Sequence, residues 1–175
     1  MNALSTKLAA GAALPDITFP IVGGGELSPG RQDGWRLLVV YRGKHCPLCK
    51  KYLDTLNRLH ADFSDAGISV MAVSADPLEK AEVQVSSQGL AFPVGYDLSI
   101  AQMRALGLYV SEPRSPEETD RPFAEPGIFV INPKDQLHLI DVSNAPFARP
   151  DLETLLDGLK FIQAKDYPIR GTLQA

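Results

Sequence analysis

The stretch Val39-Val-Tyr-Arg-Gly-Lys-His-Cys-Pro-Leu-Cys-Lys-Lys-Tyr-Leu53 decides the fold of this chain. Its apolar, β-branched beginning predicts the end of a buried strand, which Gly43 terminates. Pro47 suits the first turn of a helix, where its missing N–H would have had no partner. Leucines at helical spacing follow, and Gly67 ends the segment. The stretch therefore predicts a strand, a loop and a helix that begins at a Cys-x-x-Cys pair.

The spacing of the two cysteines gives each sulfur a different environment. Residues three apart on a helical turn lie within the distance that a disulfide needs. Cys46 would cap the helix, where unpaired N–H groups and the helix dipole favour a thiolate. Cys49 would lie one turn further in, closer to the core. We expect an exposed, ionised Cys46 to attack a substrate and a sheltered Cys49 to resolve the mixed disulfide.

A basic cluster surrounds the cysteines, although the chain as a whole carries a net charge of −4. Cations in the first turn of a helix oppose its dipole, and a broken local rule is expected at functional sites. The cluster could lower the pKa of the reactive thiol, or its lysines could simply point into water. Its members are Arg42, Lys44, His45, Lys50 and Lys51.

Size and composition indicate one globular domain. The 175 residues suffice for a substantial core, and 45% apolar and 22% charged residues are ordinary values. We expect a single domain over residues 1–175, with a core at about 13–162 and a tail at 165–175. No basic stripe indicates nucleic-acid binding, and no apolar run has the roughly 18 residues that a membrane span needs.

The cysteine usage indicates a reducing compartment. The apolar run Leu8–Leu14 after Lys7 faintly resembles a signal peptide, but it is at the lower limit of length, and Pro15 already begins the expected domain. Both cysteines lie in one motif, so no structural disulfide framework exists. A lone Cys-x-x-Cys beside a strand–helix unit is typical of redox chemistry. The cytoplasm is the expected location.

The rest of the chain alternates strands and helices. We expect strands at 14–20, 68–74, 126–131 and 136–142, and helices capped by Asp76, Asp97 and Asp151. The proline-rich segment Ser111–Glu125 is a long loop, either solvated filler or a binding or gating element. This order predicts an α/β fold: a mixed central sheet with helices on both faces and an N-terminal β extension.

Three motifs resemble a known family. They are Ala13-Leu-Pro-Asp-Ile-Thr-Phe-Pro, Tyr41-Arg-Gly-x-x-Cys-Pro-x-Cys and Pro126-Gly-Ile-Phe-Val-Ile-Asn. Together they resemble the peroxiredoxin-like branch of the alkyl hydroperoxide reductase and thiol-specific antioxidant superfamily. The resemblance covers about residues 13–162 and implies a thioredoxin-like three-layer sandwich.

The peroxiredoxin pattern is only partly present. Laid on this chain, the peroxidatic cysteine of that pattern is Cys49. Its threonine position is then Cys46, its proline position is Arg42, and its later arginine is replaced by Pro126. The groups that normally orient a peroxide are therefore missing, and a second thiol occupies one of their places.

The thioredoxin pattern assigns the two thiols differently. Cys46 becomes the nucleophile and Cys49 the resolving thiol. Pro126 then matches the cis-proline that faces the disulfide, which implies a cis Glu125–Pro126 bond. The buried acid expected before the active-site loop is Val40 here, so the usual proton acceptor for the resolving thiol is absent.

The leading hypothesis is a thiol–disulfide oxidoreductase, and the alternative is a thiol peroxidase or antioxidant protein that passes through a sulfenic acid. A zinc site is disfavoured because one Cys-x-x-Cys supplies two of four ligands, and haem attachment would need His where Lys50 stands. A redox-inert adaptor is a further alternative. No cofactor is implied. The expected partners are a disulfide or peroxide substrate and a reductant such as thioredoxin or glutathione, with a homodimer as one option.

Overall fold

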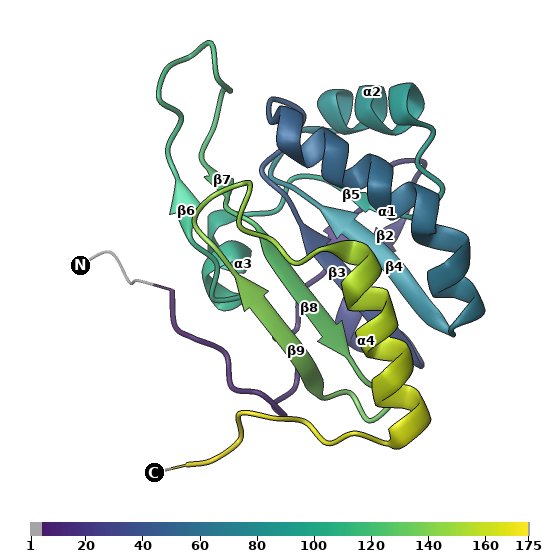
Figure 1. Cartoon of the computed structure of the whole chain (residues 1–175). Coiled ribbons are helices and arrows are strands. Elements are labelled where there is room, and N and C mark those ends of the chain that lie inside the picture. Colours follow the sequence, from purple (N-terminus) through teal and green to yellow (C-terminus); the bar gives the residue numbers. More distant parts are fainter. Residues whose placement is uncertain (1–4, 175) are drawn as a thin grey trace.

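A five-stranded mixed sheet forms the centre of the fold in a computed structural model, which describes residues 5–174 (Figure 1). Three strands run parallel, and the fourth in the order below is antiparallel to both of its neighbours. This confirms the predicted mixed α/β class. In spatial order the strands are β5 (Val94–Gly95), β4 (Ile68–Val73), β3 (Trp35–Val40), β8 (Gly127–Ile131) and β9 (Leu137–Val142).

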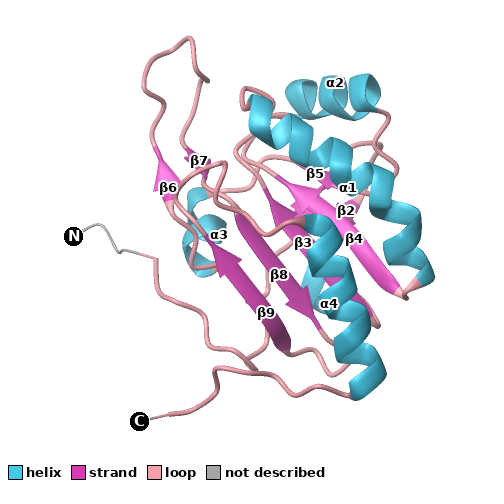
Figure 2. Cartoon of the chain, viewed as in Figure 1, coloured by secondary structure: helices cyan, strands magenta, loops and turns pink. Residues whose placement is uncertain are grey.

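Helices cover both faces of this sheet, as Figure 2 shows. Alternate residues of a strand point to opposite faces, so β3 feeds two cores. Leu37 and Val39 pack with α1 (Pro47–Asp65) and α4 (Leu152–Lys165) on one face. On the other face, Leu38 and Val40 pack with α3 (Ile100–Ala105). The fourth helix, α2 (Leu78–Gln88), follows β4.

Two pairs of short strands lie outside the central sheet. The expected N-terminal extension is a hairpin of β1 (Phe19–Pro20) and β2 (Glu26–Leu27), followed by a 3-10 turn at Pro29–Arg31. Only the last two residues of the predicted strand at 14–20 are paired as a strand. The Ser111–Glu125 loop begins and ends in a second two-residue pair, β6 (Val110–Ser111) and β7 (Phe123–Ala124). Two-residue strands carry no periodic signal, so the sequence did not reveal this pair.

The predicted helix caps are partly correct. Asp151 caps α4 by accepting the N–H of Thr154. Asp97, however, adopts a left-handed conformation, and Ser99 forms the capping box of α3 instead. Asp76 is not a helix cap, because Pro77 occupies the N-cap of α2 and the Asp76 side chain turns elsewhere. The sequence rule identified a helix start but not which of two neighbouring polar groups bonds the first turn.

Beyond Lys165, where α4 ends, the described chain forms no further helix or strand. It runs back beside the N-terminal segment, so that Thr172 lies close to Gly11. Across residues 5–174, every helix is too short or too polar to span a membrane.

Candidate active site

The loop after β3 delivers two cysteines to the first turn of α1. Cys46 is the N-cap residue in an extended conformation, and its Sγ accepts the N–H of Cys49 at 3.2 Å. Pro47 occupies the first helical position, where no donor is lost. The sulfur of Cys46 thus takes the place that a serine or aspartate oxygen has in an ordinary helix cap.

Both cysteines are buried, which corrects the expectation of an exposed nucleophile. Cys46 exposes 2% of its surface and Cys49 exposes none. Both belong to the core cluster between the sheet and helices α1 and α4. The cap determines only the backbone partner of the Cys46 sulfur; the packing of α1, α4 and the sheet around it removes the side chain from solvent.

The environment separates the acidities of the two thiols. A hydrogen bond from the Cys49 thiol lowers the pKa of Cys46 to about 6, with further help from the Cys49 N–H and from the charges of Arg149 and Arg42; burial works against them. The same thiol–thiol contact, followed by burial, raises the pKa of Cys49. The cap position and the thiol–thiol contact therefore favour Cys46 over Cys49 as the thiolate of the pair.

Arg149 is a site residue that the sequence reasoning missed. Its Nη1 lies 3.4 Å from the Sγ of Cys49, and its guanidinium stacks over the ring of Tyr52 at 4.3 Å. Tyr52 in turn donates its hydroxyl hydrogen to the carbonyl of Pro150 at 2.7 Å, which ties the loop before α4 to helix α1. The charge of Arg149 lowers the pKa of both thiols.

Arg42 belongs to a different cluster from the one expected. Its guanidinium pairs with the buried carboxylate of Glu125, at 3.1 Å from Nε to Oε2, and lies over the ring of Phe123. Ser111 donates to the same carboxylate at 2.7 Å. The positive charge that the sequence assigned to thiol activation is therefore largely neutralised by Glu125.

Lys44 and His45 lie in the loop between Arg42 and Cys46. Lys44 is exposed, but its backbone N–H donates to Oδ2 of Asp76 at 2.6 Å. His45 packs edge-on against Phe123, and both ring nitrogens are buried without a hydrogen-bond partner among the described residues. Burial lowers the pKa of His45, while the charge of Asp76 acts against this. His45 is thus neutral near pH 7, so it adds no positive charge to the site.

Asp76 braces the active-site loop, although the sequence suggested only a helix cap. It is buried, and burial raises the pKa of its carboxyl group. The loop comes so close that a Cβ on Gly43 would lie 2.7 Å from Oδ1 of Asp76. Gly43 also has a φ of +143°, so both its conformation and its surroundings favour glycine.

Pro126 lies at the same end of the sheet as the cysteine loop. The register pairs Val40 with Gly127, so Pro126 comes next to Tyr41, where β3 ends. The cis bond implied by the thioredoxin pattern is wrong, because no peptide bond of the described chain is cis. Extended pairing continues through this position, since the Pro126 carbonyl accepts the N–H of Ser143.

The long loop between β6 and β7 is anchored at its second half. Lys80 of α2 binds both Thr119 and Asp120, at 3.1 and 3.0 Å. Arg121 pairs with Asp97 at 3.2 Å. That the Ser111–Glu125 loop binds a partner stays a prediction.

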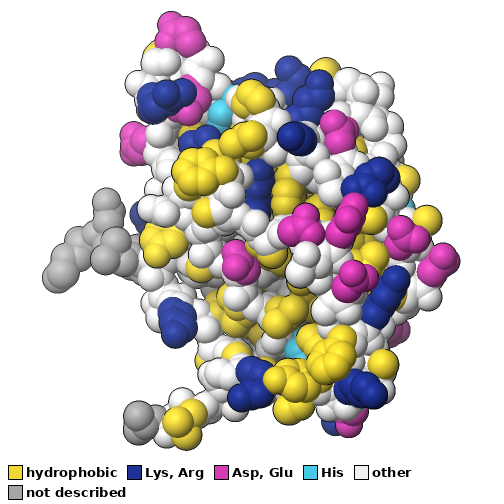
Figure 3. All heavy atoms as spheres, in the orientation of Figure 1, with side chains coloured by type: hydrophobic (Ala, Val, Ile, Leu, Met, Phe, Trp, Pro, Cys, Tyr) yellow, Lys and Arg dark blue, Asp and Glu magenta, His cyan; other side chains and the backbone are white. Residues whose placement is uncertain are grey.

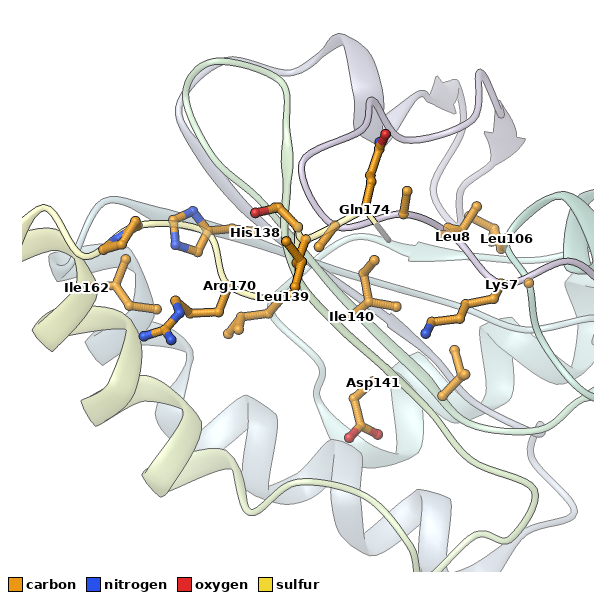
Figure 4. A pocket seen from close by; sticks show the side chains of 18 of the residues that line it. Lys7, Leu8, Leu106, His138, Leu139, Ile140, Asp141, Ile162, Arg170 and Gln174 are labelled. Carbon is orange, nitrogen blue, oxygen red and sulfur yellow. The ribbon is translucent and has the colours of Figure 1, made fainter.

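A cavity within residues 5–174 lies away from the thiols. The cavity has a volume of about 900 Å³ and lies between the two terminal segments and β9, and Figure 4 shows Leu139 and Ile140 between Arg170 and Lys7. Neither cysteine lines it. In residues 5–174, no three His, Cys, Asp or Glu side chains gather in a way that could hold a metal ion.

Comparison with known proteins places this site in a family. Residues 10–140 match the model of the AhpC/TSA family. A peroxiredoxin relative from Mycobacterium tuberculosis (strain CDC 1551 / Oshkosh) is 31% identical over 106 residues, which are 60% of this chain and 68% of that protein. The thiol-disulfide oxidoreductase ResA of Halalkalibacterium halodurans is 25% identical over 77 residues, covering 43% of this chain and 44% of that one.

The fold agrees with this assignment. The crystal structure of a peroxiredoxin-like protein from Aquifex aeolicus superposes with a TM-score of 0.77 over 91% of this chain and 90% of that chain, at 16% identity. The thioredoxin-like fold expected from the motifs is therefore confirmed, as is a thiol-dependent redox function. The chain belongs to the AhpC/TSA family, and it is a thiol-dependent oxidoreductase.

Proposed function

We propose that the protein is a thiol–disulfide oxidoreductase in which Cys46 is the nucleophile and Cys49 the resolving thiol. The observation that carries this proposal is the N-cap geometry of Cys46, whose Sγ accepts the N–H of Cys49 at 3.2 Å. The cap and the Cys49 thiol together lower the pKa of Cys46 to about 6, so its thiolate predominates at neutral pH.

The cycle balances with two thiols and one substrate disulfide. The Cys46 thiolate attacks one substrate sulfur, the substrate S–S bond breaks, and a thiolate leaves with the electron pair. Cys49 then loses its proton and attacks Sγ of Cys46, which forms the Cys46–Cys49 disulfide and releases the second substrate thiol. The protein gives up two electrons, and an external thiol reductant such as thioredoxin or glutathione restores them.

Deprotonation of Cys49 is the demanding step. The pKa of Cys49 is raised while its partner is a thiolate. Once Cys46 is in a mixed disulfide, its negative charge is gone, and the Arg149 guanidinium at 3.4 Å remains. Arg149 would then favour the Cys49 thiolate, a task that a buried acid assists in the thioredoxin pattern.

A second candidate function is thiol peroxidase activity with Cys49 as the peroxidatic residue. The observation that favours it is again Arg149, because a guanidinium beside a sulfur can polarise a bound peroxide. The peroxiredoxin relative points the same way. In that cycle the Cys49 thiolate attacks one peroxide oxygen, the O–O bond breaks, and water or an alcohol leaves. Cys46 then condenses with the Cys49 sulfenic acid, which forms the disulfide and releases water.

The burial of both sulfurs favours small substrates for either reaction. A globular partner reaches a residue with 2% exposure only if the loop before α1 moves. We therefore expect low-molecular-weight disulfides to react faster than folded disulfide proteins. A single domain in a reducing compartment such as the cytoplasm fits this proposal, since both cysteines lie in one redox motif.

One preparation tests both candidates. The rate of oxidation of the dithiol is measured with hydroxyethyl disulfide and with hydrogen peroxide, at equal concentrations and pH. The proposal expects the disulfide to oxidise the Cys46–Cys49 pair completely and faster than the same disulfide oxidises a Cys46→Ser variant. Rapid oxidation by peroxide with no reaction toward the disulfide would replace it with the peroxidase assignment.

A further inference from the structure

The thiol site is ringed by positive side chains that have no acidic partner. The ring consists of Lys44, Lys50, Lys51 and Arg149. None of the four forms an ion pair within residues 5–174, whereas the arginines at positions 31, 36, 42, 58, 114 and 121 all do. The three lysines are exposed to solvent, and Arg149 is half-buried.

Two acidic groups near the site are neutralised by ion pairs. Glu125 pairs with Arg42, and Glu118 pairs with Arg114 at 3.2 Å. Asp76 is buried and accepts a backbone N–H. Burial raises the pKa of the hydroxyl group of Tyr52, the ring under Arg149, and Asp141 and Asp151 lie close enough to raise it further. Asp54, one turn after Lys50, accepts from the side chain of Gln88 at 2.7 Å and forms no ion pair with that lysine.

Two members of the ring, Lys50 and Arg149, connect directly to the cysteines. Lys50 is four residues after Cys46 and donates its backbone N–H to the Cys46 carbonyl at 3.1 Å, so the two residues share a face of the helix. Arg149 touches Cys49 directly. Figure 3 shows dark-blue side chains gathered over the start of α1. This local charge stands against a net charge of −4 for the whole chain.

We propose that this ring makes the site selective for small anionic substrates, of which carboxylate-bearing disulfides are the class that fits the thiol chemistry. The inference deepens the proposed function and rests on it for the identity of the reacting group. The small size follows from the burial of both sulfurs. The charge preference follows from cations without ion pairs around the thiol-bearing helix start, which raise the local concentration of anions.

Alkylation measures the charge preference without assuming that the protein reduces disulfides. Iodoacetate and iodoacetamide alkylate the same thiolate and differ in one negative charge. The ratio of their rates at Cys46 therefore cancels any change in the thiolate population. We expect the ratio in the folded protein, at low ionic strength, to exceed that of the urea-unfolded chain by about three- to tenfold, and to fall toward it at ~1 M salt.

A pair of matched variants identifies the source of the preference. Lys50→Gln/Lys51→Gln removes two charges near the start of α1, and Lys160→Gln/Lys165→Gln removes two from α4, where neither lysine is a site residue. The first pair should lower the alkylation ratio by about two- to fivefold, and the second should change it by far less. Equal ratios in the wild type and both variants would overturn the proposed ring.

Three disulfides complete the experiment and separate this inference from the proposed function. Oxidised glutathione is anionic, hydroxyethyl disulfide is neutral and cystamine is cationic. At low salt we expect the dithiol to be oxidised fastest by oxidised glutathione, more slowly by hydroxyethyl disulfide and slowest by cystamine. The differences between the three rates should be smaller in Lys50→Gln/Lys51→Gln. Equal rates with all three disulfides would refute the charge selectivity but would not contradict the proposed thiol–disulfide oxidoreductase function. Reaction with none of the three disulfides would refute the proposed thiol–disulfide oxidoreductase function itself.

Discussion

The guanidinium of Arg149 lies 3.4 Å from the sulfur of Cys49, although one hundred residues separate them in the chain. The contact is fixed from outside the site, by stacking of Arg149 on Tyr52 and by the Tyr52 hydroxyl on the Pro150 carbonyl. A loop before the last helix therefore supplies the cation that touches the thiol pair, while the nearer Arg42 is engaged by Glu125.

Replacing Arg149 should have a larger effect on thiol acidity than replacing Arg42. A cation favours the thiolate, so Arg149→Gln should raise the pH midpoint of Cys46 alkylation by about 0.5–1 pH unit and slow the reaction between pH 6 and 7. Arg42→Ala should shift it less, because Glu125 already neutralises that charge. Iodoacetamide rates across pH 4–9 measure both midpoints. A larger shift in Arg42→Ala would contradict the geometry.

Asp76 should contribute to stability through the loop it braces. Asp76→Ala leaves the Lys44 N–H without an acceptor and should lower the free energy of unfolding by about 1–3 kcal/mol. Asp76→Asn keeps an acceptor oxygen and should cost less. Urea denaturation of the reduced proteins at pH 7 measures both. Equal losses would show that the packing of the side chain, and not its hydrogen bond, supports the loop.

The pH dependence of stability offers an independent check on Asp76. Burial raises the pKa of its carboxyl group in the folded protein. Its contribution is then fully present below the pKa of the unfolded chain and is lost as the pH rises through the folded-state value. Asp76→Asn should therefore gain stability relative to the wild type from pH 3 to pH 7. If the free energies of unfolding of Asp76→Asn and the wild type changed equally with pH over this range, the raised pKa of Asp76 would be contradicted.

Single-cysteine variants distinguish the roles of the two thiols. Cys49→Ser should accumulate a mixed disulfide with hydroxyethyl disulfide, because Cys46 attacks and nothing resolves the product. Cys46→Ser should react far more slowly, because the remaining thiol, Cys49, is buried and does not lie at the helix cap. Intact-mass spectrometry counts the adducts. A peroxide-derived sulfenic acid on Cys49 alone would instead support the peroxidase assignment.

The sequence predicted those parts of the site whose signals are local. The run from Val39 to Leu53 contains a strand, a glycine break, a proline at the first helical position and a leucine repeat, so it placed Cys46 at a helix start. Such signals depend on neighbours within one or two turns. The order of strands and helices followed from the same kind of pattern, and with it the mixed sheet.

Contacts between distant segments could not be predicted in this way. Arg149 lies in a loop without a motif, and only the packing of α4 against α1 brings it to Cys49. Asp76 precedes a proline and a helix, which is a capping signal, but the Lys44 N–H competes for the carboxylate. The burial of Cys46 was also missed, because a cap position indicates the backbone partner of a side chain and not what packs around it.

At neutral pH Cys46, and not Cys49, should carry the negative charge of the thiol pair. Pulse alkylation of the reduced wild type with iodoacetamide across pH 4–9, followed by peptide mapping, tests it directly. We expect modification of Cys46 with a midpoint near pH 6 and little modification of Cys49 throughout. Preferential labelling of Cys49, or no labelling of either cysteine below about pH 8, would contradict it.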